Sequence, residues 1–376
     1  MNVEMKRRYV IAIDSFKGSL TSRQANAAAA SAIVDGDVRT VAVSDGGDGM
    51  LDAFADAMDA RIEQASVHDL MMRRRTARFA VAPDGTAVIE TAEAVGLTLV
   101  KTEERNPMRS TSYGVGELIA AAVRRGARKF IVGLGGTGTS DAGIGMLRAL
   151  VDAFGKKSPS GGTVGGIDPV VADVLGGCTF TLASDVDNPL CGERGAAAVF
   201  GPQKGATPDM VRALDERARR FADFSARHYG RDCSSLPGAG AAGGLGYAFM
   251  QYLGAQMESG ADMLLRLSGM ERLLAEADVV LTGEGSADSQ TLMGKLPSRL
   301  LSLARKHGVE TWLVAGRVAD REKLLSAGFS RLEQATPADM PLVEAMRPEI
   351  AAENVRLAVR RLVCGRPMAN PQSDPK

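Results

Sequence analysis

The stretch IVGLGGTGTSD, residues Ile131 to Asp141, decides how this chain is read. It begins in the apolar run Phe130 to Val132 and leads into Ala142 to Leu150, which has the pattern of a helix. A strand, a glycine loop and a helix in this order present backbone N–H groups and a helix N-terminus to an anion. Glycine lets the backbone approach a ligand closely. With three hydroxyls interleaved, the pattern favours a phosphate or carboxylate site over a tight turn, without naming a nucleotide.

Length and composition indicate a globular protein of more than one domain. The chain has 376 residues, which at ~150 residues per domain suggests two or three domains. Apolar residues make up 45% and charged residues 24%, an ordinary globular composition. Lys plus Arg and Asp plus Glu number 45 each, so the net charge is zero. This balance argues against a nucleic-acid or membrane-surface partner.

Cysteine and histidine usage excludes several classes of site. The four cysteines form no C-x-x-C pair, so we expect free thiols in a reducing cytosol. The three histidines are scattered, which disfavours a histidine-dependent triad or a zinc site. No run of ~20 apolar residues and no signal-like segment is present, so we expect a cytoplasmic protein that does not span a membrane.

The two ends of the chain share a strand–helix rhythm. At the N-terminal end, strand patterns alternate with helix patterns, and Thr21 with Gln24 fits a capping box. The expected elements there are strands Tyr9–Asp14 and Val38–Ser44 and helices Ala25–Val34 and Met50–Met58. Near the C-terminus we expect strands Ala277–Leu281, Glu310–Ala315 and Arg331–Ala335, with helices from Pro297 to His307, Arg321–Ala327 and Pro341–Val363.

The middle of the chain has a mixed pattern. It predicts a hairpin of Arg78–Ala82 with Ala87–Glu90, a strand at Cys178–Ser184, and helices at Gly114–Arg125 and from Thr207 to about His228. We therefore predict an α/β fold: a split Rossmann-like parallel-sheet domain, residues 1–61 and 270–376, with an inserted mixed α/β domain, residues 62–269. The inserted domain carries the glycine loop, and the active site is expected in the interdomain cleft. We interpret Lys156–Gly166 as a flexible loop and the tail Met368–Lys376 as disordered.

Polar and charged residues follow the predicted strands, where ligands of parallel α/β sheets bind. Each one alone is explained by turns and helix caps, which favour Asp, Ser and Gly. For Asp48 and Asp141 the capping role is at least as well supported as a ligand role. The residues that follow strands are Ser15, Lys17, Asp45, Gly135–Asp141, Asp185, Asn188, Gly283–Gly285, Asp288 and Gln290. Five such loops together favour a ligand site.

This mixture of residues suits phosphoryl transfer, which needs cations, Mg²⁺ and a carboxylate to accept a hydroxyl proton. Lys17, Lys204 and Lys295 are the candidate cations, and Asp45, Asp185 and Asp288 are the candidate metal ligands and base. No G-x-x-x-x-G-K-[ST] motif occurs, and no G-x-G-x-x-G follows the first strand. A P-loop kinase and a dinucleotide site are therefore disfavoured. The residues alone indicate a phosphate-binding α/β enzyme, a small-molecule kinase.

Seven blocks resemble the glycerate kinase family, of the type without the separate MOFRL fold. They occur in the family's order and extend from about Val10 to Leu362. The blocks are IDSFKGSL (13–20), SDGGDG (44–49), GLGGTGTSDAGIGML (133–147), DVDNPLCG (185–192), VFGPQKGAT (199–207), PGAGAAGGLG (237–246) and LTGEGSADSQTLMGK (281–295).

The resemblance implies ATP-dependent, Mg²⁺-requiring phosphorylation of D-glycerate, most similar to the glycerate 2-kinases, by a monomer or homodimer. The triphosphate is expected on Gly135, Gly136, Thr137, Gly138, Thr139, Gly283, Glu284 and Gly285. Lys17 and Lys204 would hold the glycerate carboxylate or the γ-phosphoryl group; Ser15, Asn188, Gln290 and Lys295 would also contact substrate. Asp185 or Asp288 would be the base, and the other would bind Mg²⁺ with Asp45. A kinase of another hydroxy acid or polyol, or a non-catalytic nucleotide or anion sensor, stays open as an alternative.

Three departures from the family pattern are visible. The glycine loop usually reads GGSATNDGG, and here residues 135–143 read GGTGTSDAG. The late motif usually reads GEGRID, and residues 283–288 read GEGSAD, so the arginine is missing. The segments Arg61–Arg78 and Phe154–Leu175 look shorter than usual, which should trim the second domain or its lid.

Overall fold

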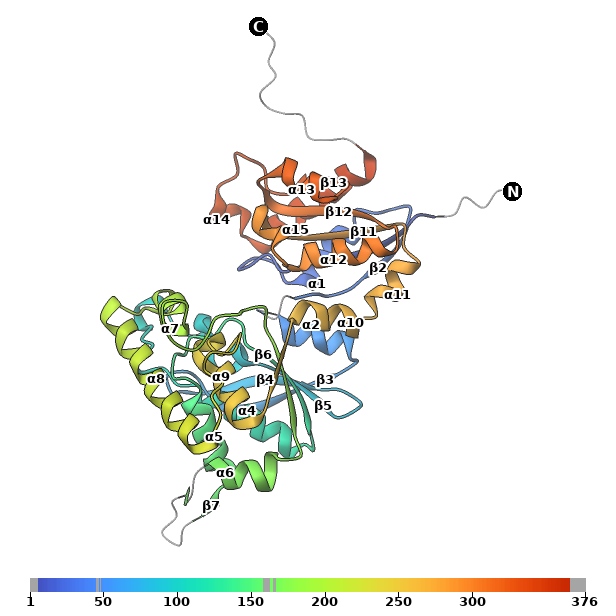
Figure 1. Ribbon diagram of the computed structural model, residues 1–376. Helices are drawn as coiled ribbons and strands as arrows, with labels where there is room; N and C mark the ends of the chain where they lie inside the picture. Colours follow the sequence, from blue (N-terminus) through green and yellow to red (C-terminus); the bar gives the residue numbers. More distant parts are fainter. Residues whose placement is uncertain (1–5, 45–46, 48, 158–162, 165–166, 366–376) are drawn as a thin grey trace. The chain divides into compact units, whose positions relative to one another are not determined.

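The computed structural model describes residues 6–44, 47, 49–157, 163–164 and 167–365. The chain divides into two compact units. The first unit combines Met1–Asp45 with Leu264–Lys376, and the second is the continuous segment Gly46–Met263 (Figure 1). Each unit is described by itself.

The first unit contains a five-stranded parallel sheet made from both ends of the chain. Its strand order is β13-β12-β11-β1-β2, so β1 lies between β2 and β11. In the β1–β11 register, Tyr9 pairs with Val279 and Ile13 with Gly283. The strands are β1 (Arg8–Ile13), β2 (Asp37–Thr40), β11 (Val279–Ala287), β12 (Glu310–Val318) and β13 (Arg331–Gln334).

Helices cover both faces of this sheet. Helices α1 and α15 share one apolar cluster with Ile11, Ile13 and Leu281, and α12 and α13 share another with Leu313 and Leu332. The helices of this unit are α1 (Ser22–Ala30), α11 (Met270–Ala275), α12 (Leu296–Lys306), α13 (Arg321–Ala327), α14 (Leu342–Ala345) and α15 (Pro348–Cys364), and α10 (Gly260–Leu267) contains the boundary between the units.

Several local sequence signals are reproduced in this unit. Thr21 and Gln24 form the predicted capping box of α1, and α12 has a proline in its first turn. The single helix predicted for Pro341–Val363 is wrong, because it is divided into α14 and α15. Arg347, the residue before Pro348, is extended, as the proline ring requires of its neighbour.

The second unit contains a six-stranded mixed sheet with the order β10-β9-β6-β5-β4-β3. Strands β3, β4 and β5 are antiparallel neighbours, and β5, β6, β9 and β10 run parallel. The predicted hairpin is confirmed, with Ala80 opposite Val88. The strands are β3 (Arg61–His68), β4 (Arg74–Val81), β5 (Thr86–Glu90), β6 (Lys129–Gly133), β9 (Thr179–Ala183) and β10 (Gln256–Glu258). The α/β fold class, with one parallel and one mixed sheet, is confirmed.

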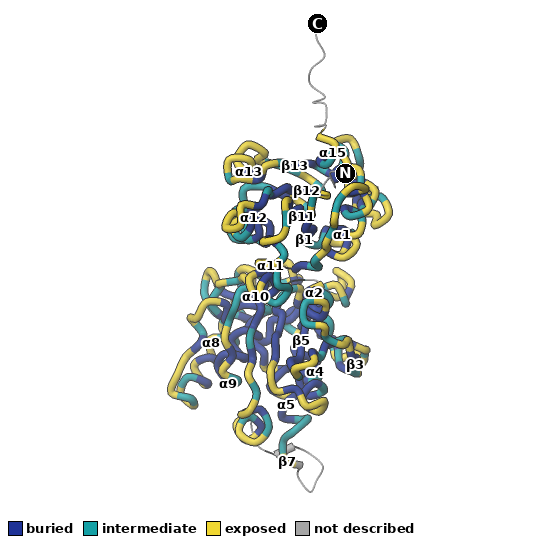
Figure 2. Tube along the Cα trace, turned by 90° about the vertical axis from the view of Figure 1, so that its right-hand side faces the viewer, coloured by how far each residue is buried: buried dark blue, intermediate teal, exposed yellow. Residues whose placement is uncertain are grey.

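Helices α4, α5 and α9 enclose the apolar core of this unit, which is dark blue in Figure 2. Lys156–Lys157 and Thr163–Val164, within the segment interpreted as a flexible loop, form the short ladder β7–β8. The helices are α2 (Met50–Ala57), α3 (Thr91–Val95), α4 (Tyr113–Arg124), α5 (Ile144–Phe154), α6 (Ile167–Val170), α7 (Ala196–Phe200), α8 (Pro208–Tyr229) and α9 (Ala241–Leu253).

Helix α2 belongs to the second unit, whereas the boundary drawn from sequence at residue 61 placed it in the first. The Glu90 carboxylate at the end of β5 accepts the backbone N–H of Leu51 at 2.9 Å. Arg78 of β4 pairs with Asp52 of α2 at 3.2 Å. These contacts attach the start of α2 to the sheet of the second unit.

Candidate functional site

Three parallel strands of the second unit end at the same level. Glu90, Gly133 and Ala183 are aligned across β5, β6 and β9. The segments that follow these strands therefore begin at one edge of the sheet. Those segments include the glycine loop, residues 134–141, and the predicted site residues Asp185 and Asn188.

Backbone contacts with residues 95–97 hold the glycine loop in place. Thr137 bridges to Gly96, the Leu97 N–H donates to the Gly136 carbonyl at 2.8 Å, and the Gly138 N–H donates to the Val95 carbonyl at 2.9 Å. Gly136 has a φ of 72°, a conformation that favours glycine. Gly138 has no positive φ, but a Cβ there would lie 2.6 Å from Leu70 Cδ1.

Asp141 joins this loop to the start of α5. Its buried carboxylate accepts the Ser112 N–H at 2.8 Å, the Ser112 hydroxyl at 2.9 Å and the Gly145 N–H at 3.0 Å. Ala142 and Gly143 have φ values of 53° and 76°, so α5 begins at Ile144 and not at Ala142. The contacts support the capping role for Asp141.

Lys204 is the last residue of the short helix η4 (Pro202–Lys204), and its side chain contacts the glycine loop. Its side chain is buried, and Nζ donates to the Thr139 carbonyl at 2.6 Å. Burial lowers the pKa of Lys204 to about 8, although the nearby Asp141 charge opposes the shift. Arg217 of α8, which the sequence did not single out, donates to the Ser140 carbonyl at 3.0 Å.

The block PGAGAAGGLG packs against the same loop. Ala242, Gly243 and Gly244 all have positive φ values, and the Ala142 N–H donates to the Gly243 carbonyl at 3.0 Å. A Cβ on Gly243 would lie 2.0 Å from the Thr139 carbonyl oxygen. Glycine at this position therefore serves the close approach of two backbones.

The segment after β9 carries Asp185, whose side chain is exposed, and Asn188. The Asn188 amide donates to the Arg194 carbonyl at 2.7 Å, and its own carbonyl accepts the Gly240 N–H at 2.8 Å. Asn188 thus links this segment to the start of α9.

In the first unit, the segment after β1 lies beside the last residues of β11. A Cβ on Gly285 would be 3.8 Å from the Lys17 backbone nitrogen. The Lys17 side chain is exposed, and Ser15 is partly buried. Helices α1 and α12, which follow these two strands, cover opposite faces of the sheet, so β1 and β11 flank a topological switch point, where parallel α/β sheets bind ligands.

The predicted loop at Gly283–Gly285 is wrong, because β11 continues through it to Ala287. The neighbouring strand β12 is long enough to pair Ala287 with Val318. A Cβ on Gly283 would lie 2.0 Å from the Val314 carbonyl oxygen, so strand packing requires this glycine.

Glu284 is buried in β11 and contacts two other residues of its own sequence block. Its carboxylate accepts the Thr291 hydroxyl at 2.7 Å and pairs with Lys295 Nζ at 3.2 Å. Asp288 caps the short helix η5 (Ser289–Leu292) by accepting the Gln290 N–H at 2.7 Å. Gln290 itself is exposed. Asp45 and Asp48 lie outside the described residues.

A family model described as the glycerate kinase family matches residues 9–364. The chain belongs to the glycerate kinase family. It is therefore a kinase. The expectation drawn from the seven sequence blocks is confirmed at this level.

Individual relatives of this kinase cover most of its length. A glycerate kinase of Bacillus subtilis (strain 168) is 39% identical over 372 residues, which cover 94% of this chain and 96% of the relative. A glycerate 2-kinase of Escherichia coli (strain K12) is 37% identical, with coverage of 83% and 86%. A crystal structure described provisionally as glycerate kinase 2 from Salmonella typhimurium LT2 superposes with a TM-score of 0.79 at 34% identity, covering 96% of this chain and 98% of that one.

The described part of this kinase holds no group of three His, Cys, Asp or Glu side chains that could form a metal cage. Mg²⁺ in phosphoryl-transfer enzymes is usually held by one or two carboxylates together with substrate phosphates. Asp185 of the second unit is exposed, and Asp288 of the first unit is partly buried. Among the described residues, no helix is long and apolar enough to cross a membrane.

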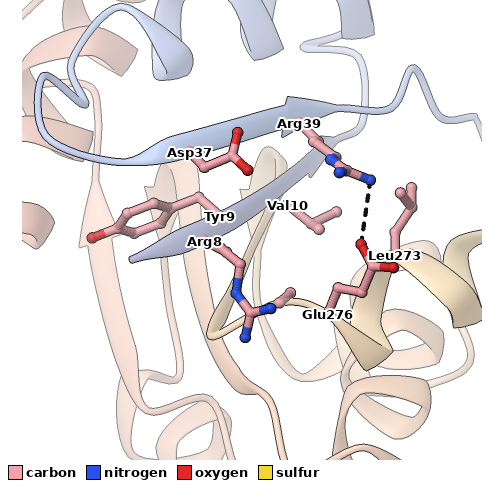
Figure 3. Close-up of a pocket in the computed structure, with 8 residues that line it drawn as sticks. Arg8, Tyr9, Val10, Asp37, Arg39, Leu273 and Glu276 are labelled. Atoms are coloured by element: carbon pink, nitrogen blue, oxygen red, sulfur yellow. Dashed lines mark ion pairs between the residues drawn. The ribbon is translucent and has the colours of Figure 1, made fainter. Parts of the chain in front are cut away.

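Two hollows of the first unit lie away from the switch point. One, of about 240 Å³, lies at the amino ends of β1 and β2, where Arg39 pairs with Glu276 at 3.6 Å (Figure 3). The other, of about 610 Å³, lies beside β13 and is lined by Arg321, Arg331 and Arg361, each of which donates to a backbone carbonyl. Neither hollow contains a residue predicted for the site.

Proposed function

We propose that this kinase transfers the γ-phosphoryl group of ATP to D-glycerate and forms 2-phospho-D-glycerate. The observation that carries the proposal is the family match across residues 9–364, together with relatives named glycerate kinase and glycerate 2-kinase. The glycine loop after β6 and the exposed Lys17 after β1 supply the anion-binding groups that such a substrate pair needs.

The proposed roles follow the local geometry of each unit. Gly135–Thr139 binds nucleotide phosphates through its backbone, and Lys17 binds the glycerate carboxylate or the γ-phosphoryl group. Asp185 accepts the proton of the attacking hydroxyl, because Asp288 already caps η5 with one carboxylate oxygen. Ser15, Asn188, Gln290 and Lys295 are the further candidates for contact with the substrate.

Mg²⁺, when bound, neutralises charge on the transferring phosphates. Asp288 is the described carboxylate that would hold it, with Asp45 as a second candidate, because Asp185 is assigned as the base. The residues of this chain place the hydroxyl in line with the phosphorus and exclude water. They accept one proton as the new O–P bond forms.

A coupled assay of ADP release with D-glycerate and a panel of other hydroxy acids and polyols tests the proposal. We expect D-glycerate to give the highest kcat/KM, and phosphorus NMR of the product to place the phosphate on the 2-position. A value for D-glycerate about tenfold or more below that for another acceptor would overturn the choice of substrate. ATP binding without ADP release would indicate a sensor instead of an enzyme.

A further inference from the structure

Two cations hold two consecutive carbonyl groups of the glycine loop. Lys204 Nζ donates to the Thr139 carbonyl at 2.6 Å, and Arg217 Nη2 donates to the Ser140 carbonyl at 3.0 Å. Lys204 is only 3% exposed, and its ammonium group is directed at the backbone of the loop. Both contacts are to the backbone, so the two cations fix the orientation of the peptide groups.

The orientation of the peptides has a direct geometric result. In a trans peptide the C=O and the following N–H point in opposite directions. Holding the two carbonyls toward the cations therefore turns the N–H groups of Ser140 and Asp141 away from them. Within the part of the chain that the structure describes, neither N–H has a hydrogen-bond partner. Ser140 and Asp141 are each 8% exposed, and backbone N–H groups in such surroundings are almost always hydrogen-bonded, so these two are candidate donors to a ligand.

Two side chains of the same loop also carry polar atoms without a hydrogen-bond partner among the described residues. The hydroxyls of Thr139 and Ser140 are buried and have no hydrogen-bond partner among the described residues. Thr139 is fully buried and Ser140 is 8% exposed. Helix α5, with 11 residues, begins just after them and adds its positive end. Two N–H groups and two hydroxyls, all without a partner among the described residues, thus lie close to a helix N-terminus.

We propose that the N–H groups of Ser140 and Asp141 and the hydroxyls of Thr139 and Ser140 bind an oxyanion, and that Lys204 and Arg217 are positioning residues that orient these peptides from behind. The inference rests on the proposed function only for the identity of the anion, which is a nucleotide phosphate or the carboxylate of glycerate. It moves the anion site from Gly135–Thr139 toward Thr139–Asp141, and it assigns Lys204 a role without substrate contact.

Variants of Arg217 test the positioning role. Arg217→Gln removes the charge that holds the Ser140 carbonyl, and Arg217→Lys keeps a charge. Arg220→Gln is the matched control, because Arg220 is an exposed residue of the same helix that pairs with Glu216 at 3.8 Å. Binding of inorganic tripolyphosphate and of D-glycerate is measured separately by calorimetry on the whole protein, at constant ionic strength.

We expect Arg217→Gln to lower the affinity for one of the two anions by about tenfold or more and to leave the affinity for the other within about twofold of the wild type. Arg217→Lys should restore most of the affinity, and Arg220→Gln should match the wild type. The anion that weakens identifies the source of the bound oxyanion. Unchanged affinity for both, or equal loss for both with a lower unfolding midpoint, overturns the inference, as does a wild type that binds neither anion.

Hydroxyl variants provide a second test that does not depend on Arg217. Thr139→Val and Ser140→Ala remove a buried hydroxyl that has no partner, so the free protein should unfold at the same or a higher temperature. Anion affinity should nevertheless fall by about fivefold or more. Lower stability with unchanged affinity would overturn the inference. A wild type that binds anion but releases no ADP would contradict the proposed function and leave this inference intact.

Discussion

Lys204 carries an ammonium group in a place that solvent does not reach. A lysine of this kind is stable only because the Thr139 carbonyl and the Asp141 charge compensate part of the lost hydration. Sequence could identify the residue but not its burial, because the local pattern GPQKGA also suits a solvated turn. Its environment comes from elements far away in the chain.

The buried lysine predicts a dependence of stability on pH. Burial lowers the pKa of Lys204 from 10.5 to about 8. Below pH 8 both folded and unfolded chains carry the proton, and the cost of burying it is fully present. Between pH 8 and 10.5 the unfolded chain binds more protons, so this cost is relieved as pH rises. Relative to Lys204→Met, the wild type should gain at most ~3 kcal/mol in free energy of unfolding.

Urea unfolding of the wild type and of Lys204→Met at several values from about pH 7 to pH 10 measures this effect. The methionine variant titrates like the wild type elsewhere, so the difference between the two curves isolates residue 204. Parallel curves across this range would contradict the prediction.

At Gly138 we predict that an added side chain destabilises the protein through a steric clash and not through backbone strain. Gly138→Ala restores the residue usual in the family, and the φ angle permits it. The new methyl group would meet Leu70 Cδ1 at 2.6 Å and Leu97 Cα at 3.2 Å, so we expect a loss of about 1–2 kcal/mol in unfolding free energy. Gly177→Ala is the control, because nothing lies within 4 Å of its added Cβ. Combining Gly138→Ala with Leu70→Ala should cost less than the sum of the two changes, and strict additivity would rule out this contact.

The two candidate bases are separated by asparagine variants. Asp185→Asn should lower kcat by about 10²–10⁴-fold, because the amide cannot accept the hydroxyl proton. Asp288→Asn keeps the cap on η5, since asparagine caps as well as aspartate. A fall in kcat for Asp288→Asn would therefore report a role in chemistry and not a loss of folding. Steady-state kinetics with circular dichroism decides, and near wild-type kcat in Asp185→Asn would exclude it as the base.

At the scale of elements, the sequence predicted what local interactions determine. The capping box at Thr21, the proline in α12 and the helix α13 depend on residues within one or two turns, and all three occur as expected. The continuation of β11 through Gly283–Gly285 was not predictable in this way. Glycine and acid usually mark loops, but here the long neighbour β12 supplies hydrogen bonds that keep the segment extended.

Thr291 links β11 to η5, and its substitution measures how much this link contributes to the free energy of unfolding. Its hydroxyl donates to the buried Glu284 carboxylate at 2.7 Å and accepts the Asp288 N–H at 3.0 Å. Thr291→Val keeps the shape and removes both bonds, which should cost about 2 kcal/mol in free energy of unfolding. Thr102→Val is the control, because Thr102 is exposed. Equal unfolding midpoints in urea for the two variants would show that the link contributes little.

For the molecule as a whole, the family was readable from sequence because the blocks extend over nearly all of the chain. The candidate site was only partly readable. The glycine loop was found, since strand, glycines and helix are adjacent in sequence. Arg217 was missed because α8 carries several other arginines, including Arg212, Arg219 and Arg220, and only packing shows which one faces inward.

The pairing of β1 with β11 also has a consequence for biosynthesis. Ala12 and Thr282, which are bonded across these strands, are 270 residues apart. At 5–20 residues per second, a ribosome needs roughly 15–50 s to deliver the partner of the first strand. Most of that interval is spent on the synthesis of residues 46–263, which have their own core, and during it the apolar run Tyr9–Ile13 can pair with β2 but not with β11. One edge of β1 on the nascent chain therefore stays unpaired until β11 has been synthesised.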